Sequence, residues 1–278
     1  MRFYQEDLRQ GIFTEGKLIK KKETPYQRIL LFESPFFGKI MSIDEDFQFS
    51  EKEEFIYHEP LAHIPMNILP KAKKILIIGG GDGCLARELI KYKNIEGIDL
   101  CDIDKAVVDF SKTYLGDINK NALNSKKVRI FIEDGLSFIK TNTGPYDLVF
   151  LDLTDPVDKK STKLYDTKTM LQFKNVLSED GLIVMYSGAP ILYPKLCRAI
   201  QQNLNKAFPF KKIFLVYVPV FGTLASFSIC SKSQISSKNS QKIDAQLKEA
   251  GLKNLKYYKG EIHNSLFVIP RFLEPVFR

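Results

Sequence analysis

Acidic side chains follow four apolar, strand-like runs of the sequence. The four are Asp82 after "KKILIIGGG", Asp102 at the end of "GIDLCD", Asp134 after "VRIFIE" and Asp152 at the end of "YDLVFLD". Because the carboxyl ends of parallel strands meet at one edge of a sheet, we expect these carboxylates to line a common rim. In a chain with a formal net charge of +8, an acidic rim predicts a ligand that carries positive charge.

The run "KKILIIGGGDG" has the form of a buried strand, a tight glycine turn and the start of a helix. Such a turn lets the backbone, here at Gly79 and Gly81, approach a ligand closely. About 20 residues later, Asp102 ends the second strand, where an acidic residue can hold ribose hydroxyls. The pair fits dinucleotide enzymes and enzymes that use S-adenosyl cofactors. A tight turn followed by a surface aspartate is the alternative without a ligand.

The third and fourth strands carry the remaining carboxylates of the rim, with Asp155 as a fifth. Asp134, in "FIEDG", is placed to accept a hydrogen bond from the amino group of an adenine. Asp152 and Asp155, in "FLDLTDP", stand three residues apart at the end of one strand, where open α/β sheets bind ligands. A purely structural alternative exists here too, because Asp-Pro starts turns well and an aspartate can cap the next helix.

The elements that must position these residues come in two styles. Residues 1 to about 55 contain short β-prone runs, "QRILLFES" and "FFGKIMSI", which predict hairpins of a small β domain. From about residue 72, aliphatic runs alternate with helical patterns such as "KAVVDFSKTYL". That alternation predicts an α/β fold with a parallel sheet covered on both faces. Near the end, "KKIFLVYVP" and "LASFSICS" have no helix between them and predict an antiparallel pair.

Composition limits the class of protein. No apolar stretch approaches the roughly 20 residues that a membrane helix needs, and the charged start lacks the apolar core of a secretory signal. The four cysteines lie without CxxC spacing or metal-partner clusters, so we expect reduced thiols and no metal. The lysines are spread out and do not alternate with aromatic residues, which favours a solvated surface over nucleic-acid binding. We expect a cytoplasmic protein.

Several motifs follow one another in a specific order. They are "PYQRILLFESPFFGKIMSIDEDFQFSEKEEFIYHE", "GGGDG", "CDID", "EDG", "DLTDP" and, near the end, "LKYYKGEIHNSLFVIPRFL". Over nearly the whole chain they resemble the polyamine aminopropyltransferases, the spermidine synthase family. The resemblance implies a Rossmann-like, seven-stranded α/β domain of the S-adenosylmethionine methyltransferase type at residues 56–278. It also implies a small β domain at residues 1–55 and assembly into homodimers or homotetramers.

The resemblance explains why a carboxylate stands in the glycine turn. The family's co-substrate is decarboxylated S-adenosylmethionine, a sulfonium with a free amine and no carboxylate. Asp82 would repel the carboxylate of ordinary S-adenosylmethionine, whereas it would form a charge-assisted hydrogen bond with the ammonium of the decarboxylated form. The other positions that match the family's cofactor contacts are Gln27, Gly79, Gly81, Asp102 for the ribose, and Asp134 with Gly135 for the adenine.

The resemblance also implies an amine site. Asp152 matches the family's general base, which takes a proton from the attacking amine. Asp155 would hold ammonium groups of the acceptor, Tyr57 would orient the attacking nitrogen, and His58 would contact the amine or the aminopropyl chain. Without the resemblance, Tyr57 would belong to an aromatic helix face and His58 would be a hydrogen-bonded core histidine.

Two departures bear on the acceptor. Leu153 replaces a small polar residue beside the base, and the Gly-Pro that usually follows Asp-Pro is absent. Phe221, in "VPVFGT", stands where the family usually has a tyrosine that contacts the far end of a diamine. Putrescine, giving spermidine, is the first expectation, and a longer polyamine is the alternative. A methyltransferase on the same fold and a non-catalytic sensor of nucleoside or polyamine remain as other readings.

Overall fold

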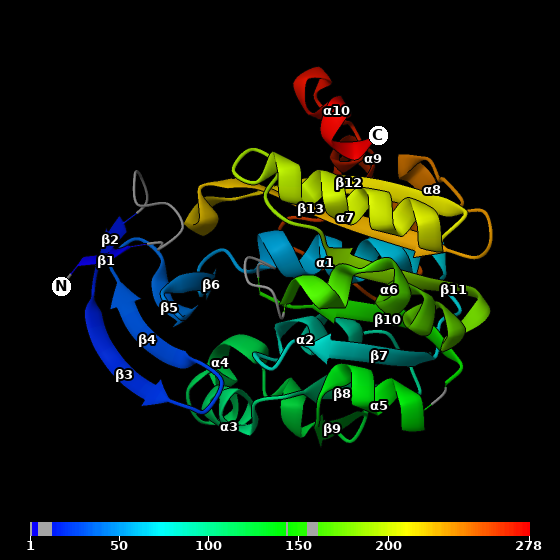
Figure 1. Cartoon of the computed structure of the whole chain (residues 1–278). Coiled ribbons are helices and arrows are strands. Elements are labelled where there is room, and N and C mark those ends of the chain that lie inside the picture. The colour runs from blue at the N-terminus through cyan, green and yellow to red at the C-terminus, as the bar shows by residue number, and fades with distance from the viewer. Residues whose placement is uncertain (1, 5–12, 143, 155–160) are drawn as a thin grey trace.

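The computed structural model describes residues 2–4, 13–142, 144–154 and 161–278. These residues form sheets of two, four and seven strands, with helices on both faces of the largest sheet (Figure 1). The strands are β1 (Arg2–Tyr4), β2 (Phe13–Glu15), β3 (Lys17–Glu23), β4 (Arg28–Ser34), β5 (Gly38–Ile43), β6 (Asp46–Ser50), β7 (Lys74–Gly79), β8 (Gly97–Asp102), β9 (Val128–Ile132), β10 (Tyr146–Asp152), β11 (Leu177–Tyr186), β12 (Phe210–Val218) and β13 (Thr223–Ser231).

Along the chain, most helices come between successive strands of the large sheet. They are α1 (Phe55–Ile68), α2 (Cys84–Leu89), α3 (Lys105–Tyr114), α4 (Gly116–Asn119), α5 (Gly135–Thr141), α6 (Thr167–Asn175), α7 (Pro194–Ala207), α8 (Ser240–Glu249), α9 (Gly260–Leu266) and α10 (Glu274–Phe277). Short 3-10 turns are η2 (Ala122–Asn124), η3 (Ser161–Tyr165), η4 (Pro219–Phe221) and η5 (Arg271–Leu273).

The seven-stranded sheet confirms the predicted α/β fold. Its order is β12-β13-β11-β10-β7-β8-β9. The strands from β11 to β9 run parallel, and β12 and β13 form the expected antiparallel pair, which joins β11. This order puts the carboxyl ends of β7, β8, β9 and β10 side by side, as the rim of aspartates requires.

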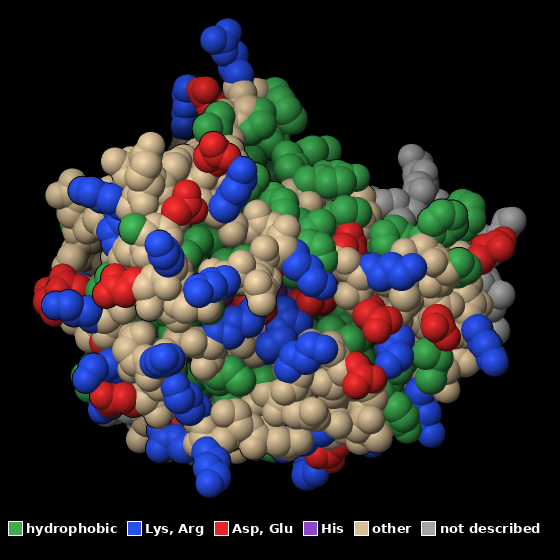
Figure 2. Space-filling view, turned by 180° about the vertical axis from the view of Figure 1, so that it is seen from behind, with side chains coloured by type: hydrophobic (Ala, Val, Ile, Leu, Met, Phe, Trp, Pro, Cys, Tyr) green, Lys and Arg blue, Asp and Glu red, His purple; other side chains and the backbone are tan. Residues whose placement is uncertain are grey.

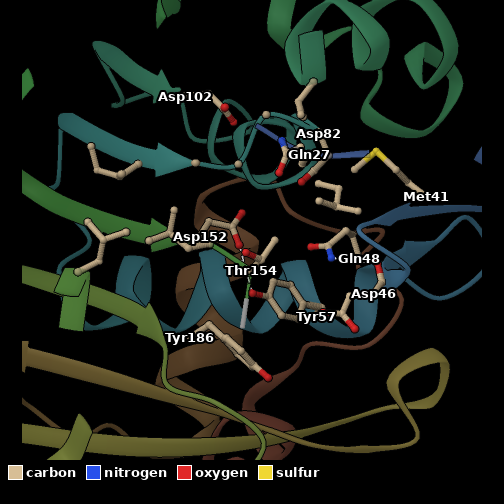
Figure 3. Close-up of a pocket in the computed structure, with 18 of the residues that line it drawn as sticks. Gln27, Met41, Asp46, Gln48, Tyr57, Asp82, Asp102, Asp152, Thr154 and Tyr186 are labelled. Atoms are coloured by element: carbon tan, nitrogen blue, oxygen red, sulfur yellow. Dashed lines mark hydrogen bonds between the residues drawn. The ribbon is translucent and has the colours of Figure 1, made fainter. Parts of the chain in front are cut away.

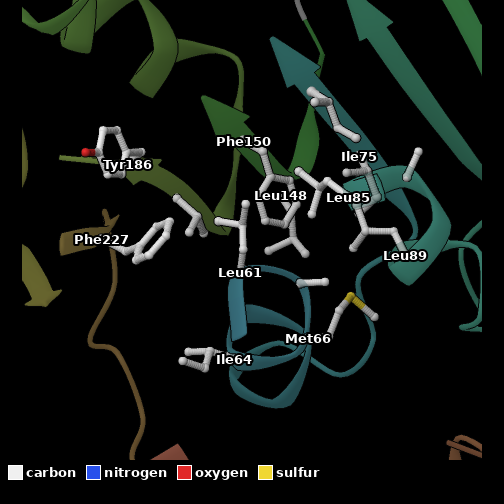
Figure 4. Packing of buried hydrophobic residues seen from close by; sticks show 14 of the residues in the cluster. Leu61, Ile64, Met66, Ile75, Leu85, Leu89, Leu148, Phe150, Tyr186 and Phe227 are labelled. Atoms are coloured by element: carbon white, nitrogen blue, oxygen red, sulfur yellow. The ribbon is translucent and has the colours of Figure 1, made fainter. Parts of the chain in front are cut away.

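Alternate residues of the central strands pack on opposite faces, as the strand period of two demands. Ile75 and Ile77 of β7 join a core with α1 and α2, while Leu76 and Ile78 join a separate core with α5, α6 and α7. On the first face, Leu61 of α1 packs against the sheet beside α2 (Figure 4). Burial of both faces explains why these strands are aliphatic along their whole length.

The N-terminal four-stranded sheet has the order β3-β4-β5-β6. The sequence analysis predicted strands at β4 and β5 but not at β3 or β6. All seven residues of β3 are exposed, and the strand forms by pairing antiparallel with β4. Phe32, Ile40 and Phe47 of this sheet belong to the same core as α1 and the central strands. Division of the chain at residue 55 stays a prediction.

The segment after α8 is fixed to α1 by one buried carboxylate. Glu59 accepts hydrogen bonds from the backbone N–H groups of Lys256, Tyr257 and Tyr258 at 2.8, 2.8 and 2.9 Å. Three donors satisfy a charged group that is 3% exposed and would otherwise be costly to bury. The C-terminal segment is therefore part of the environment of α1.

The surface agrees with the predicted solvated basic character. On the face in Figure 2, lysine and arginine side chains are spread among acidic and polar ones, and apolar side chains gather toward the top of the view. Within the described ranges, no helix is both long and apolar enough to cross a membrane. All four cysteines are buried and free of disulfide bonds.

Candidate active site

A cavity of about 270 Å³ opens at the carboxyl ends of β7, β8, β9 and β10, between the large sheet and the N-terminal sheet. In Figure 3, Asp82, Asp102 and Gln27 lie together at the top of the view, and Asp152, Thr154 and Tyr57 lie below them. The predicted site residues that line the cavity are Gln27, Tyr57, His58, Gly79, Gly81, Asp82, Asp102, Asp134, Gly135, Asp152 and Phe221. Asp155 lies outside the described residues.

The first glycine of the turn is required by a neighbouring strand. Gly79 has a φ of +80°, and a Cβ there would lie 2.2 Å from the backbone oxygen of Asp152. The same oxygen accepts a hydrogen bond from the N–H of Gly80 at 3.0 Å. The turn after β7 therefore packs directly against the end of β10, which fixes the position of Asp152. The sequence analysis had assigned this glycine to close approach of a ligand.

The third glycine, Gly81, leaves room for the carboxylate of Asp102. A Cβ on Gly81 would lie 2.5 Å from Oδ2 of Asp102. The other carboxylate oxygen, Oδ1, accepts the backbone N–H of Asp104 at 2.8 Å. Burial is the largest influence on Asp102, and with the nearby charges of Asp104 and Asp82 it raises the pKa of Asp102 to about 6. The Asp102 carboxyl thus sits against the turn and faces the cavity.

Asp152 and Tyr57 meet at the centre of the cavity. The Tyr57 hydroxyl donates a hydrogen bond to Oδ1 of Asp152 at 3.1 Å. Oδ2 is buried and has no hydrogen-bond partner among the described residues. Burial and the charge of Asp82 raise the pKa of Asp152 to about 6, while His58 and the Tyr57 hydroxyl oppose that rise. Tyr57 thus orients one oxygen of this carboxyl, and the other is buried near the turn at Gly80 without a hydrogen-bond partner in the described residues.

Asp82 and His58 form the other polar side of the cavity. Oδ1 of Asp82 accepts the N–H of Cys84 at 2.7 Å, and Nε2 of His58 lies 3.8 Å from the same oxygen. One side-chain atom each of His58, Asp82 and Asp152 lies within 4.8 Å of the other two. The Asp82 side chain keeps 16% of its surface exposed, toward the cavity. A cation bound here would contact two carboxylates.

Gln27 connects the N-terminal sheet to the loop that follows β8. Its Nε2 donates to Oδ2 of Asp104 at 3.1 Å, and the hydroxyl of Thr24 donates to the same oxygen at 2.8 Å. Asp104 also caps α3 by accepting the N–H of Ala106. The sequence analysis named Asp102 but not Asp104, because an aspartate before a helix is a common cap.

Asp134 is exposed at the edge of the cavity, and the neighbouring Gly135, which also lines the cavity, is buried. Oδ1 of Asp134 accepts the N–H of Ser137 at 2.9 Å and so caps α5. The structural role that the sequence allowed for an acidic rim residue is therefore present at Asp134. The residue also lines the cavity, so both roles are compatible.

Aromatic rings around Tyr57 form one wall of the cavity. The ring centroid of Tyr57 lies 5.0 Å from that of Phe227 and 6.1 Å from that of Phe221, both in edge-to-face geometry. Tyr186 stands 6.5 Å from Tyr57 on the same side. Tyr57, Phe221 and Tyr186 line the cavity and can contact apolar groups of a ligand, while Phe227 is fully buried behind them.

The sequence analysis missed two groups of residues near the cavity. Asp46 and Gln48 line it from β6, and their two-residue spacing matches one face of a strand. Glu54 and Arg87 form a buried ion pair behind it. The alternation in "DFQFS" is a local signal that points to the first group. The ion pair joins residues 33 positions apart and has no local signal.

Comparison with known proteins agrees with this geometry. Residues 54–242 match the spermine/spermidine synthase domain, and residues 16–51 match the spermidine synthase tetramerisation domain. The chain is 32% identical over 277 residues to the polyamine aminopropyltransferase of Thermoanaerobacter pseudethanolicus, covering 98% of this chain and 95% of that protein. It is 35% identical over 263 residues to the enzyme of the same name from Buchnera aphidicola, covering 94% and 91%.

Two solved structures have the same fold over almost the whole chain. A spermidine synthase crystallised in complex with the transition-state analogue AdoDATO superposes with a TM-score of 0.91 at 28% identity, covering 99% of this chain and 94% of that one. The spermidine synthase of Thermotoga maritima has a TM-score of 0.89 at 28% identity, covering 99% and 93%. Since both domain matches, the relatives and the fold agree, this chain belongs to the spermine/spermidine synthase family and is a polyamine aminopropyltransferase.

Proposed function

We propose that this enzyme transfers the aminopropyl group of decarboxylated S-adenosylmethionine to putrescine, giving spermidine and methylthioadenosine. The observation that carries the proposal is the hydrogen-bonded pair of Tyr57 and Asp152, with one Asp152 oxygen left without a partner in the described residues. The pair lies in a cavity that Asp82 and Asp102 also line. Such a site suits two cationic reactants that must be held together.

The chemistry assigned to these residues is a displacement at carbon. The acceptor nitrogen attacks the methylene beside the sulfonium, a carbon–nitrogen bond forms, and the carbon–sulfur bond breaks with methylthioadenosine as leaving group. Asp152 takes the proton that the attacking nitrogen loses. Tyr57 holds one oxygen of Asp152 and so fixes the orientation of the carboxylate that receives this proton. Asp155 is proposed to hold the ammonium groups of the acceptor, as the family resemblance implies.

The cofactor assignment follows from the charges at the glycine turn. We assign Asp102 to the ribose, Asp134 and Gly135 to the adenine, and Asp82 to the ammonium of the decarboxylated cofactor, with Gln27 and the turn at Gly79 and Gly81 beside them. A carboxylated cofactor would place two like charges close together in a partly desolvated site. The low exposure of the Asp82 side chain, 16%, supports this discrimination.

Calorimetry with the two S-adenosyl cofactors tests the assignment. We expect the decarboxylated form to bind at least about tenfold more tightly, a difference of about 1.4 kcal/mol. Asp82→Asn removes the repelling charge and should reduce that ratio. An unchanged ratio would show that the charge of Asp82 does not select the cofactor, and tighter binding of the carboxylated form would favour a methyltransferase.

A product assay tests which amine is the acceptor. The enzyme is incubated with the decarboxylated cofactor and a panel of diamines and triamines, and the products are identified by chromatography. We expect putrescine to give the highest specificity constant. The alternative acceptor is a longer polyamine such as spermidine, which Phe221 favours because its ring has no hydroxyl for a distal ammonium. Cofactor binding without turnover of any amine would favour a sensor and contradict the proposed activity.

A further inference from the structure

A buried chain of charged side chains stands behind the cavity and links α1 to α2. Nη1 of Arg87 lies 2.8 Å from Oε1 of Glu54, and Nη2 lies 2.8 Å from Oε2. Oε2 of Glu54 in turn lies 2.9 Å from Nδ1 of His58. The exposed fractions of His58, Glu54 and Arg87 are 3, 6 and 9%. A bidentate pair at this depth holds the Glu54 carboxylate in one orientation.

The far side of Arg87 keeps this pair in place. Nε of Arg87 donates to Oε1 of Glu88 at 2.8 Å, and Nη1 also donates to the backbone oxygen of Ile118 at 2.9 Å. Oε2 of Glu88 pairs with His63 at 3.0 Å. The guanidinium is therefore bound on three sides, and Glu54 cannot turn away from His58 without losing two charged hydrogen bonds.

These contacts determine which nitrogens of His58 carry hydrogen. Nδ1 lies 2.9 Å from the backbone oxygen of Glu54 and 2.9 Å from its Oε2, and both atoms are acceptors, so Nδ1 is a donor. Nε2 points the other way, toward Oδ1 of Asp82 at 3.8 Å, with Asp152 in the same cluster. Both ring nitrogens thus face oxygens that favour a hydrogen, which is the arrangement of an imidazolium.

The surroundings of His58 have opposing effects on its pKa. Burial lowers the pKa of His58, but the hydrogen bond with Glu54 and the charges of Asp82, Glu54 and Asp152 raise it to about 9. Tyr57 and Cys84 are close by, and burial raises the pKa of both well above the usual value. Arg87 is a permanent cation of the same buried chain of charges, and it faces Glu54 rather than the cavity.

We propose that His58 is the counter-cation of Asp82 before the cofactor binds, and that it releases its proton to solvent when the cofactor's ammonium takes its place beside Asp82. Glu54 is the positioning residue that holds the ring for this exchange. The inference rests on the proposed function, since it takes the ammonium of the decarboxylated cofactor as the incoming cation.

The physical reason is competition of two cations for one carboxylate. An ammonium in contact with Asp82 would lie within a few ångströms of Nε2 of His58, where like charges repel. Repulsion lowers the pKa of the bound-state histidine, so a proton leaves the ring and enters the buffer, and no covalent bond of the ligand changes. Because binding releases a proton, cofactor affinity should rise with pH between the bound-state and free-state pKa values of His58.

Titration calorimetry at pH 8 with the decarboxylated cofactor isolates this proton. At that pH, Asp152 and Asp102, whose pKa values are about 6, are ionised, and His58 is mostly protonated. Phosphate and Tris have different heats of ionisation. The binding enthalpies measured in the two buffers therefore differ in proportion to the number of protons released. We expect roughly half to one proton per site for the wild-type enzyme.

Three variants complete the test. His58→Asn should bind the cofactor with almost no proton release, and Glu54→Gln should release less than the wild type because the ring loses its charged partner. His263→Asn, a buried histidine on α9 that does not line the cavity, is the matched control and should release as much as the wild type. The His58→Asn variant shows whether His58 is the source of the released proton, even if Glu54→Gln fails to fold.

The outcomes separate the two proposals. Tight binding by the wild type with equal enthalpies in both buffers would overturn the role of His58 and leave the proposed function standing. Proton release that persists in His58→Asn would assign the proton to another group and also overturn it. Failure of the wild type to bind the decarboxylated cofactor would instead overturn the proposed function, and the inference with it.

Discussion

Asp152 combines two properties that a general base in a cationic site requires. Its burial next to Asp82 raises the pKa to about 6, which makes the carboxylate a better proton acceptor than an ordinary aspartate. Its hydrogen bond from Tyr57 fixes one oxygen. Because a side-chain atom of Asp152 lies within 4.8 Å of one of His58, the protonation state of each residue affects the pKa of the other.

Asp152→Asn should reduce turnover by about two to four orders of magnitude, as expected when a positioned general base is lost. Cofactor affinity should change little. In the wild type, the protonated acid cannot accept a proton, so kcat/KM should rise with pH through about 6 as Asp152 ionises. Steady-state kinetics across pH 5 to 9 measure both effects, and near-normal turnover in the variant would exclude Asp152 from the role.

The short turn η4 carries the side chain that bears most directly on the acceptor. Oε1 of the buried Glu53, two residues before α1, accepts the backbone N–H of Val220 at 2.9 Å. Phe221, the next residue, lines the cavity beside Tyr57, and the two rings are in edge-to-face contact. The start of α1 and this turn are thus held together, and the position of the Phe221 ring is fixed by the fold.

Phe221→Tyr adds a hydroxyl to that ring. We expect the specificity constant for putrescine, relative to that for spermidine, to rise by about 10- to 100-fold, the effect of one hydrogen bond to a charged group. Competition assays with both amines and product chromatography measure the ratio. Tyr217→Phe, which changes an exposed residue on β12 that does not line the cavity, is the control. A ratio that stays the same in both variants would show that residue 221 does not contact the distal amine.

The elements that the sequence predicts well are those whose pattern reflects burial. β7, β8 and β10 are apolar runs that are buried on both faces. β9, at the edge of the sheet, is partly exposed but keeps enough apolar residues to be recognised as a strand. The rim follows because each run ends at or shortly before an aspartate. β3 is different: it is lysine-rich and exposed, so no apolar alternation marks it, and only pairing with β4 makes it a strand. The Glu54–Arg87 pair could not be predicted either, because burial of an ion pair depends on which helices meet in three dimensions.

The whole molecule presents an edge strand to solvent. β3 is the first strand of the N-terminal sheet, and in the described chain it pairs with β4 alone. Its apolar residues Leu18 and Ile19 are 37 and 42% exposed. This strand falls within residues 16–51, which match the tetramerisation domain. Exposed strand edges readily pair with another chain, so we expect β3 to contribute to contacts between subunits.

Light scattering at micromolar concentration should give the mass of two or four chains. Ile19→Asp places a charge in the expected contact and should shift the population toward smaller species without unfolding the subunit, since the residue is exposed. Leu171→Asp, at an exposed position of α6 with 42% exposure, is the control and should keep the wild-type mass. A clean monomer for the wild-type enzyme would contradict the expectation.

The contact between Glu59 and residues 256–258 affects when α1 can complete its folding during synthesis. The carboxylate and its donors are separated by 197 to 199 residues of sequence. During synthesis, α1 leaves the ribosome long before these donors exist, and its buried carboxylate lacks these three backbone partners until residues 256–258 have emerged. The helix that carries Tyr57 therefore reaches its final environment late, and a chain that stops short of residue 256 lacks part of the support of its own active site.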